Sequence, residues 1–167
     1  MPRIDGRYVT GPISEQRFIS DGVASYFSKI LGNGVTALGT NLQVTAEFPD
    51  IFVKNGDAFL GGFLFRLIDD GGGLLTLTET SGTRKDRVII RMDTTTGAFT
   101  VYIKQGTATP PALESTATVT EISLALLDIS GSSVTITDER TICEMILVPD
   151  IPPTPTDPEE PSIWGGI

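Results

Sequence analysis

The sequence predicts an all-β fold: an antiparallel, jelly-roll-like β-sandwich with one α-helix near its N-terminus. From Leu42 onward, apolar residues recur at every second position, which is the period of a half-buried strand. The apolar segments are short and regularly spaced, and glycine-bearing turns separate them, as in β-sandwiches and barrels. One segment before Leu42 has instead the three-to-four-residue spacing of an amphipathic helix.

Length and composition fit one globular domain. The chain has 167 residues, and a domain near this size buries roughly 70% of the surface that its unfolded chain exposes. Hydrophobic residues make up 40% of it, which is typical of globular proteins. No apolar run approaches the ~18 residues of a membrane span, and the N-terminus has no apolar segment typical of a secretory signal. We therefore expect neither membrane insertion nor export by a signal peptide.

Composition divides the chain into three parts. Residues 1–13 show little periodicity, and we expect an extended arm there. Residues 14–148 carry the periodic apolar segments and are predicted to form the helix and the sandwich. Residues 149–167 interleave prolines with Asp and Glu, which favours a flexible acidic tail of polyproline II character. Trp164 lies in this tail and is a candidate anchor to a partner.

The helix is predicted over residues 21–31. Asp21 can act as its N-cap, because a carboxylate accepts hydrogen bonds from the free amide groups of the first turn. Four apolar side chains then fall on one face at helical spacing: Val23, Phe27, Ile30 and Leu31. Gly32, followed by an Asn-Gly pair, predicts the end of the helix.

The first strands of the sandwich are expected on either side of residue 55. Apolar and polar residues alternate from Leu42 to Ala46, and Ile51–Val53 is the next apolar segment. Asn55-Gly56 follows, and this dipeptide favours a type I′ turn, in which both central residues need positive φ. We therefore predict a β-hairpin that joins the strand ending at Val53 to the next one.

That next strand is predicted to run from Ala58 to Ile68, and it is apolar on both faces. Such a strand is central, or it is covered on its second face by a helix or by another subunit. Gly61-Gly62 within it indicates a bulge or a close backbone approach. The glycine-rich segment at 69–73 then turns the chain, and Leu75 and Leu77 alternate with threonines on the return.

Five further strands are predicted to complete the domain. Thr96-Gly97 and Ser130–Ser132 are the turns expected between neighbouring strands. The segment from Ile122 to Ile129 is almost continuously apolar, which indicates a buried strand. The apolar parts of the five strands are Val88–Met92, Phe99–Ile103, Ile122–Ile129, Val134–Ile136 and Ile142–Val148.

The amino-acid composition argues against several classes of function. The formal charge of −9, from 12 basic and 21 acidic residues, repels phosphate polymers, so no nucleic-acid partner is expected. The chain has no histidine, which excludes Ser-His-Asp and Cys-His catalysis and removes the commonest zinc ligand. Cys143 is the single cysteine; no intrachain disulfide can form, and we expect a buried structural thiol in the last strand.

The acidic residues do not predict a catalytic or metal site. Asp86 and Asp93 would be about 23 Å apart on an extended segment, too far to act together as glycosidase carboxylates do. Each is expected to be a turn residue at a strand end, and the basic cluster Arg84–Arg87 is expected in a solvated loop. The acidic, glycine-rich loop at 69–73 lacks the donor spacing of an EF-hand. We predict no catalytic residue, no cofactor and no metal.

Six segments, in order, carry a family resemblance, and the first two are Gly34-Val35 and Asn41–Ala46. Asn55–Phe63 ends in a Gly-x-Ala-x-x-x-Gly-aromatic pattern, and Arg84–Asp93 looks like Arg-x-Asp-Arg-Ile-Val-Leu-Arg-Leu-Asp. Thr120–Ile129 is similar to a Tyr-x-Leu-x-Leu-Ala segment, with Thr120 in place of the tyrosine, and Val134–Cys143 is similar to an Ile-x-Asp-x-Arg…Cys ending. Over residues 20–147 the chain thus resembles tail and baseplate proteins of siphophages that infect Gram-positive bacteria.

The resemblance implies an N-terminal helix on a β-sandwich, like the shoulder domain of lactococcal phage receptor-binding proteins. In those proteins the shoulder forms a trimer and attaches to the baseplate, while a separate head binds cell-surface saccharide. This chain shows no collagen-like neck and no head, and it looks like a short member of this kind from a Bacillus siphophage. Receptor binding is therefore not implied. The expected location is the virion tail, or the host cytoplasm during assembly.

The leading hypothesis is a non-enzymatic structural or adaptor protein of the tail-tip (baseplate) region. It would associate with itself, with a homotrimer implied by the resemblance, and would dock to other tail proteins. The candidate oligomer and docking residues are Val23, Phe27, Leu31, Leu60, Leu64, Ile68 and Trp164. The alternative is a saccharide-binding module that contributes to host cell-surface adsorption. Its candidate stacking residues are Tyr8, Tyr26, Tyr102 and Trp164.

Overall fold

One layer of the fold is a five-stranded antiparallel sheet with the strand order β1-β9-β8-β10-β11. The computed structural model describes residues 16–17, 21–68, 73–78 and 82–146, and residues 16–17 and 21–23 through their backbone alone. The strands of this large sheet are β1 (Gln16–Arg17), β8 (Thr83–Asp93), β9 (Ala98–Lys104), β10 (Val119–Ser130) and β11 (Ser133–Asp138).

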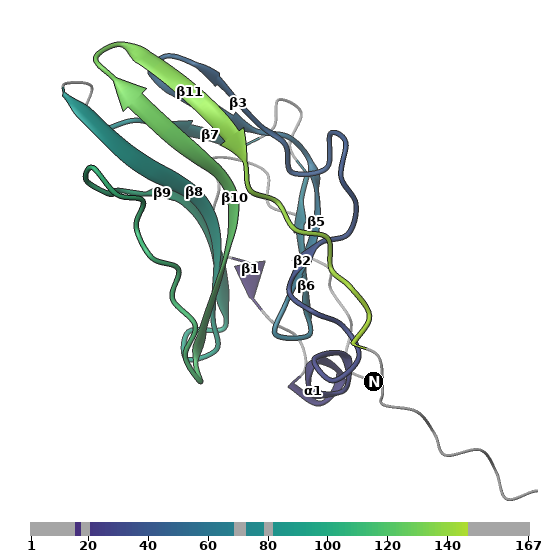
Figure 1. The fold of residues 1–167 in the computed structure, drawn as a ribbon. Coiled ribbons are helices and arrows are strands. Elements are labelled where there is room, and N and C mark those ends of the chain that lie inside the picture. Colours follow the sequence, from purple (N-terminus) through teal and green to yellow (C-terminus); the bar gives the residue numbers. More distant parts are fainter. Residues whose placement is uncertain (1–15, 18–20, 69–72, 79–81, 147–167) are drawn as a thin grey trace, which may run out of the picture.

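The opposite layer consists of two three-stranded antiparallel sheets, with the orders β2-β5-β6 and β3-β4-β7. They follow one another along the length of the large sheet, and the helix α1 (Asp21–Phe27) lies at the β2-β5-β6 end (Figure 1). Their strands are β2 (Gly34–Val35), β3 (Val44–Glu47), β4 (Asp50–Val53), β5 (Gly56–Leu60), β6 (Phe63–Leu67) and β7 (Gly73–Thr76). The prediction of an all-β sandwich with one short helix is confirmed. The division of the second layer was not predicted. No helix in the described ranges is long and apolar enough to span a membrane.

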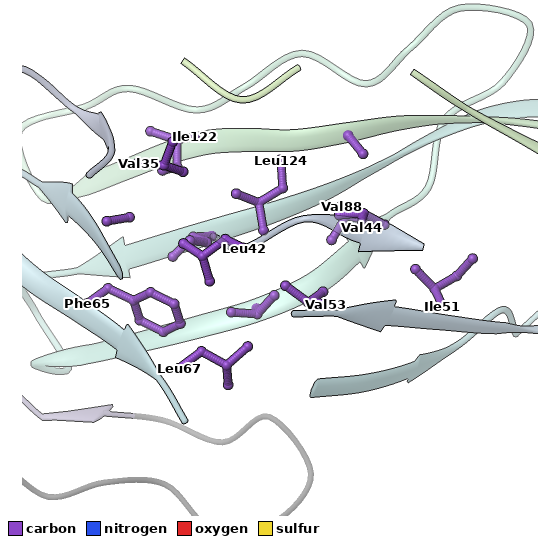
Figure 2. Close-up of a cluster of buried hydrophobic side chains, with 14 of the residues drawn as sticks. Val35, Leu42, Val44, Ile51, Val53, Phe65, Leu67, Val88, Ile122 and Leu124 are labelled. Atoms are coloured by element: carbon purple, nitrogen blue, oxygen red, sulfur yellow. The ribbon is translucent and has the colours of Figure 1, made fainter. Parts of the chain in front are cut away.

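The core fills the space between the two layers. Figure 2 shows Val53, Phe65 and Leu67 of the small sheets pointing toward side chains of the large sheet such as Val88 and Leu124. The largest side chains that solvent does not reach include Leu42, Ile51, Leu60, Ile90, Leu124 and Leu127. Full burial of one such side chain stabilises a fold by roughly 1.5–3 kcal/mol, so this cluster dominates the stability of the sandwich.

The central strand β10 confirms the prediction of a buried strand over Ile122–Ile129. Its pairing with β8 shifts register between Ser123 and Ala125, so that Leu124 is an extra residue in a β-bulge. Leu124 and Ala125 both belong to the core. The strands β8, β9 and β11 also form where predicted, and β9 follows a turn in which Gly97 has φ 67°.

The segment Ala58–Ile68 is not one central strand, as predicted, but the hairpin β5–β6. Gly61-Gly62 is its two-residue turn, with φ values of 57° and 84°, and Leu60 pairs with Phe63 across it. Both positive φ values favour glycine, as in a type I′ turn. The predicted close backbone approach does occur there, since a Cβ on Gly62 would collide with the carbonyl oxygen of Ala24 in α1.

The hairpin predicted at Asn55-Gly56 does not form. β4 pairs with β3 and β7, whereas β5 pairs with β2 and β6, so the chain crosses here from one small sheet to the other. The Asn41 side chain explains the crossing, because it accepts a hydrogen bond from the Asp57 amide (2.7 Å) and donates one to the Asp57 carbonyl (3.0 Å). A Cβ on Gly56 would collide with this Asn41 side chain. The glycine is thus required for close packing rather than for a turn.

Two further boundaries differ from the prediction. β7 does not return along β6 but pairs with β4. The helix ends at Phe27 rather than at Leu31, and in place of a last strand the described residues after β11 form two isolated bridges, Leu31 with Met145 and Val35 with Ile142. The amides of Gly32 and Ile146 bond respectively to the carbonyls of Glu144 and Ile30 (2.8 and 2.9 Å). These bonds hold the chain after the helix in an extended form.

Candidate functional site

Exposed and half-buried apolar and aromatic side chains lie along the outer face of the hairpin β5–β6, from its turn, where α1 packs, to Ile68 at its opposite end. Leu64 lies opposite Phe59 in the antiparallel register, and the ring centroids of Phe59 and Phe27 are 6.2 Å apart. Tyr26 contacts Phe27 edge to face, with 5.9 Å between the centroids. Tyr26, Leu64 and Ile68 are 64%, 47% and 41% exposed. We call these five residues, Tyr26, Phe27, Phe59, Leu64 and Ile68, the helix–hairpin face.

Three of the residues predicted for docking belong to this face: Phe27, Leu64 and Ile68. Leu60 does not, and its assignment to the surface was wrong, because it is an inward-pointing residue of β5 with no exposed surface. A single strand over Ala58–Ile68 would place Leu60 on the same face as Leu64, whereas the two-residue turn at Gly61-Gly62 places the two side chains on opposite faces. Leu31 is half-buried.

The other two predicted docking residues are not described in full. Val23 lies in α1, but its side chain is outside the described residues, and Trp164 is outside them entirely. Met145 was missed by the sequence prediction. It is 72% exposed and pairs with Leu31, just after the helix. Its segment was expected to be a buried strand, so its apolar composition gave no sign of exposure.

A second region, on the outer face of the large sheet, is charged. The Glu121 carboxylate, which has no exposed surface, accepts hydrogen bonds from Lys104 Nζ (2.6 Å), the Glu114 amide (2.8 Å), the Tyr102 hydroxyl (2.9 Å) and Arg91 Nη1 (3.0 Å). The register places Glu121 directly opposite Arg91. Arg91 Nη1 also donates to the Glu114 carboxylate at 2.7 Å. Arg91 projects from β8, the strand beside β10, while Tyr102 and Lys104 project from β9, the next strand of the sheet. Glu114 reaches them from the β9–β10 connection.

These contacts set the ionisation of the cluster. Burial by itself raises the pKa of Glu121, but the hydrogen bonds from Lys104, the Glu114 amide, Tyr102 and Arg91 together lower it below its ordinary value. Burial, and then the hydrogen bond to Glu121, raises the pKa of Tyr102. A catalytic acid at neutral pH needs a raised carboxyl pKa instead. The ionised, fully paired Glu121 is therefore suited to holding structure.

A neighbouring set of contacts continues along the same face. Arg87 donates to both carboxylate oxygens of Glu139 (2.9 and 3.2 Å) and to the carbonyl of Pro111 (2.6 Å). The Ser123 hydroxyl donates to Glu139 at 2.6 Å. Burial raises the pKa of Glu139, and the bonds from Arg87 and Ser123 outweigh it, so the pKa is lowered overall.

The predicted positions of the acidic residues were partly wrong. Asp86 is not a turn residue: it lies within β8 with no exposed surface, where it accepts hydrogen bonds from Arg84 Nε (2.8 Å) and the Gly106 amide (3.0 Å). The basic cluster around it is likewise part of β8 and not a solvated loop, because ion pairs let charged residues occupy a long strand. Asp93 is the turn residue expected. It accepts bonds from the amides of Thr95 and Thr96, and the Thr95 amide in particular lowers its pKa.

The motif residues after β11 also have a structural role. Arg140 forms a two-bond ion pair with Asp138 (2.6 and 2.9 Å), which lowers the pKa of the Asp138 carboxyl. Its third nitrogen donates to the carbonyls of Asn41 (2.6 Å) and Gly39 (3.0 Å). Arg140 thus joins the end of the large sheet to the loop before β3.

The cysteine, the tyrosines and the acidic side chains were the other candidates for a reactive, saccharide-binding or metal-binding site. Cys143 is half-buried outside any strand, and burial raises the pKa of its thiol. Of the tyrosines in the described ranges, Tyr26 is exposed and Tyr102 is bonded to Glu121, while Tyr8 lies outside them. No group of three or more His, Cys, Asp or Glu side chains in the described part of the chain is placed to hold a metal ion.

A pocket of about 220 Å³ lies where β7 approaches β8 and β9. Its polar lining includes Arg84 and Asp86, which are already paired with each other, and Gln105, which donates to Thr78 at 2.9 Å. Apolar side chains from β7 and β9 complete its wall. Contacts within the protein thus engage these polar groups.

The chain was compared with protein-family models, curated protein sequences and solved structures. No protein-family model, no curated protein sequence and no solved structure matches the chain. The resemblance of its segments to siphophage tail proteins accordingly stays a prediction.

Proposed function

We propose that this protein is a non-enzymatic structural or adaptor module of a siphophage tail tip, which acts by self-association and by docking to other tail proteins. The supporting observation is the helix–hairpin face, where two structural elements together expose apolar side chains. Contiguous exposed apolar patches on folded domains typically mark interaction sites. The sequence resemblance supplies the class of assembly.

The position of β6 supports the same proposal. Within the described ranges it is the outermost strand of its sheet, and an edge strand offers backbone groups to which another chain can pair. Leu64 projects from this strand. The Asp57–Arg66 ion pair, with two bonds of 2.6 and 3.0 Å, lies on the same outer face between Leu64 and Ile68. A partner that covers this face would therefore meet apolar groups around one ion pair.

Charge favours a particular kind of tail-protein partner. The chain carries a formal charge of −9, and many of the described basic side chains are engaged in ion pairs within the protein. A partner with basic residues would complement the charge of the chain as a whole and would associate faster at low salt.

Light scattering of the full chain over a wide concentration range tests self-association. We expect a mass above the 17.8 kDa of one chain, and a shift toward the monomer in Leu64→Asp. Leu38→Asp is the matched control, because Leu38 is also about half exposed (49%) but lies in the loop between β2 and β3. Monomer alone at every concentration would contradict self-association.

Mass spectrometry of purified virions tests the assignment to the tail. We expect this chain among the tail proteins, and its absence would contradict a virion role. Binding to cell-wall polysaccharide by a chain that stays monomeric would favour the saccharide-binding alternative instead.

A further inference from the structure

The connection between β9 and β10 crosses the outer face of the large sheet. In the strand order, β9 and β10 flank β8 on opposite sides, so residues 105–118 must pass over β8 to join them. Figure 1 shows this segment along the side of the large sheet that faces away from the two small sheets. We call residues 105–118 the strap.

The first part of the strap is held to the end of β8. The Lys85 amide donates to the carbonyl of Thr107 (2.8 Å), and the Gly106 amide donates to the buried carboxylate of Asp86 (3.0 Å). A Cβ on Gly106 would collide with the carbonyl oxygen of Lys85, so this approach requires glycine. The strap therefore leaves the sheet from a fixed point.

Two arginines of β8 hold the middle of the strap. Arg87 donates to the carbonyl of Pro111 (2.6 Å), and Arg91 donates to the carboxylate of Glu114 (2.7 Å). Glu114 is also bonded through its backbone, because its amide donates to the Glu121 carboxylate and its carbonyl accepts from the Glu121 amide (2.8 and 2.9 Å). The bonds that join the strap to the strands are thus formed by charged side chains and by backbone groups.

Ile89 lies beneath the strap. It points to the same face of β8 as Arg87 and Arg91, between them, and yet it has no exposed surface. The strap itself adds few buried apolar groups: Leu113 is 40% exposed, and no residue of the strap belongs to the core cluster. A segment attached by few buried apolar contacts has a low free energy of local opening.

We propose that the strap opens from the large sheet as a unit while the sandwich stays folded, and that the charged cluster of Glu114, Arg91 and Glu121 controls this opening. Opening uncovers Ile89 and one side of the Glu121 carboxylate. The inference is independent of the proposed function, since it depends only on the contacts between the strap and the large sheet.

Acid favours the open form. The groups that face Glu121 are Arg91 of β8, Tyr102 and Lys104 of β9, and Glu114 of the strap. Protonation of Glu121 removes the negative charge with which Arg91 and Lys104 are paired. The lowered pKa of Glu121 means that its contribution persists somewhat below the ordinary carboxyl range before it is lost.

The neighbouring charges beside the strap act in the same direction. Arg87 holds the carbonyl of Pro111 while it is paired with Glu139, which Ser123 also contacts. The Glu139 carboxyl likewise has a lowered pKa. Protonation of Glu139 in acid therefore releases Arg87 and weakens the second hold on the strap.

Hydrogen exchange at neutral pH, followed by mass spectrometry, tests the proposal. In Glu114→Gln we expect amides of residues 105–118 to exchange roughly threefold to tenfold faster, since a partly buried ion pair is lost. The slowest amides of β8 and β10 should keep their rates. Asp128→Asn is the matched control, because it removes the side-chain ion pair with Lys85 (3.4 Å) on the same two strands and leaves the backbone bond from Lys85 to the strap in place.

A second variant keeps Glu114 and reads the opening by proteolysis. In Arg91→Gln, a glutamate-specific protease should cut after Glu114 several-fold faster than in the wild type, while cleavage after the exposed Glu47 is unchanged. Exchange of the strap and of β10 at one common rate in every variant would overturn the proposal, because the strap would then open only with global unfolding. If the amides of the strap exchange at the wild-type rate in Glu114→Gln, the charged cluster does not control the opening, and that part of the proposal is overturned.

Discussion

Glu121 of β10 lies directly opposite Arg91 of β8, and the two side chains form a 3.0 Å ion pair in which the carboxylate has no exposed surface. A buried carboxylate is stable only when other groups satisfy its oxygens. Here Lys104, Tyr102 and the Glu114 amide do so together with Arg91. The cations themselves are 26–29% exposed, so water shares in their solvation.

Replacing Glu121 by glutamine should destabilise the protein by about 1–3 kcal/mol, because two cations lose a shared partner while the shape is kept. Urea denaturation measures the loss. Glu144→Gln serves as the control, since Glu144 is exposed, and it should change the free energy of unfolding by less than about 0.5 kcal/mol. Equal effects of the two substitutions would contradict the role of the cluster.

Stability should fall in acid. The folded-state pKa values of Glu121, Glu139 and Asp138 are lowered, so these groups contribute fully above their ordinary pKa values of 4.5, 4.5 and 3.8, and the contribution is lost as pH falls through the lowered values. Thermal unfolding followed from pH 7 to pH 2 should show a flat region and then a decline below about pH 4.5. Glu121→Gln should decline less steeply, and a profile identical to that of the wild type would contradict the assignment.

Gly62→Ala should be far more damaging than Gly131→Ala. Both glycines have positive φ, 84° and 58°, so each substitution costs about 1–2 kcal/mol of backbone strain. A Cβ at position 131 meets nothing within 4 Å, whereas one at position 62 collides with the backbone of α1. We expect at least about 2 kcal/mol of additional destabilisation for Gly62→Ala, measured by chemical denaturation. Similar losses would mean that the helix moves away at little cost.

Leu60→Ala and Leu64→Ala should separate the core from the surface of the hairpin. Leu60 is completely buried, so its truncation should cost about 3 kcal/mol. Leu64 is 47% exposed, and its truncation should cost less than about 1 kcal/mol while weakening self-association. Denaturation and light scattering of the same two variants measure both effects. A reversed order of the two stability losses would contradict the hairpin.

The sequence predicted β8, β9, β10 and β11 of the large sheet because each has a strong apolar pattern, whereas the two-residue β1 was not predicted. β8 and β9, for example, are joined by a turn at Gly97, and the Thr96-Gly97 dipeptide predicted this turn. The small sheets were harder to predict. Their pairings depend on long-range contacts such as that between Asn41 and Asp57, which leave no local pattern.

The candidate surface was predicted only in part for the same reason. Phe27 and Leu64 were found from their apolar character, and the error at Leu60 came from reading Gly61-Gly62 as a bulge within one strand. Asp86 was misplaced because charged side chains predict solvent exposure, whereas its buried ion pair with Arg84 is visible only in the fold. The strap had no apolar period, and nothing in its sequence showed that it crosses a sheet.

The extra residue Leu124 in β10 sets the phase of the whole strand. Before it, odd-numbered side chains such as Glu121 and Ser123 point away from the core; after it, odd-numbered side chains such as Leu127 and Ile129 point into it. In a strictly alternating strand one of these two groups would be on the wrong side, with a charge in the core or leucine and isoleucine in water. Deleting this single residue would therefore exchange inside for outside along half of the strand.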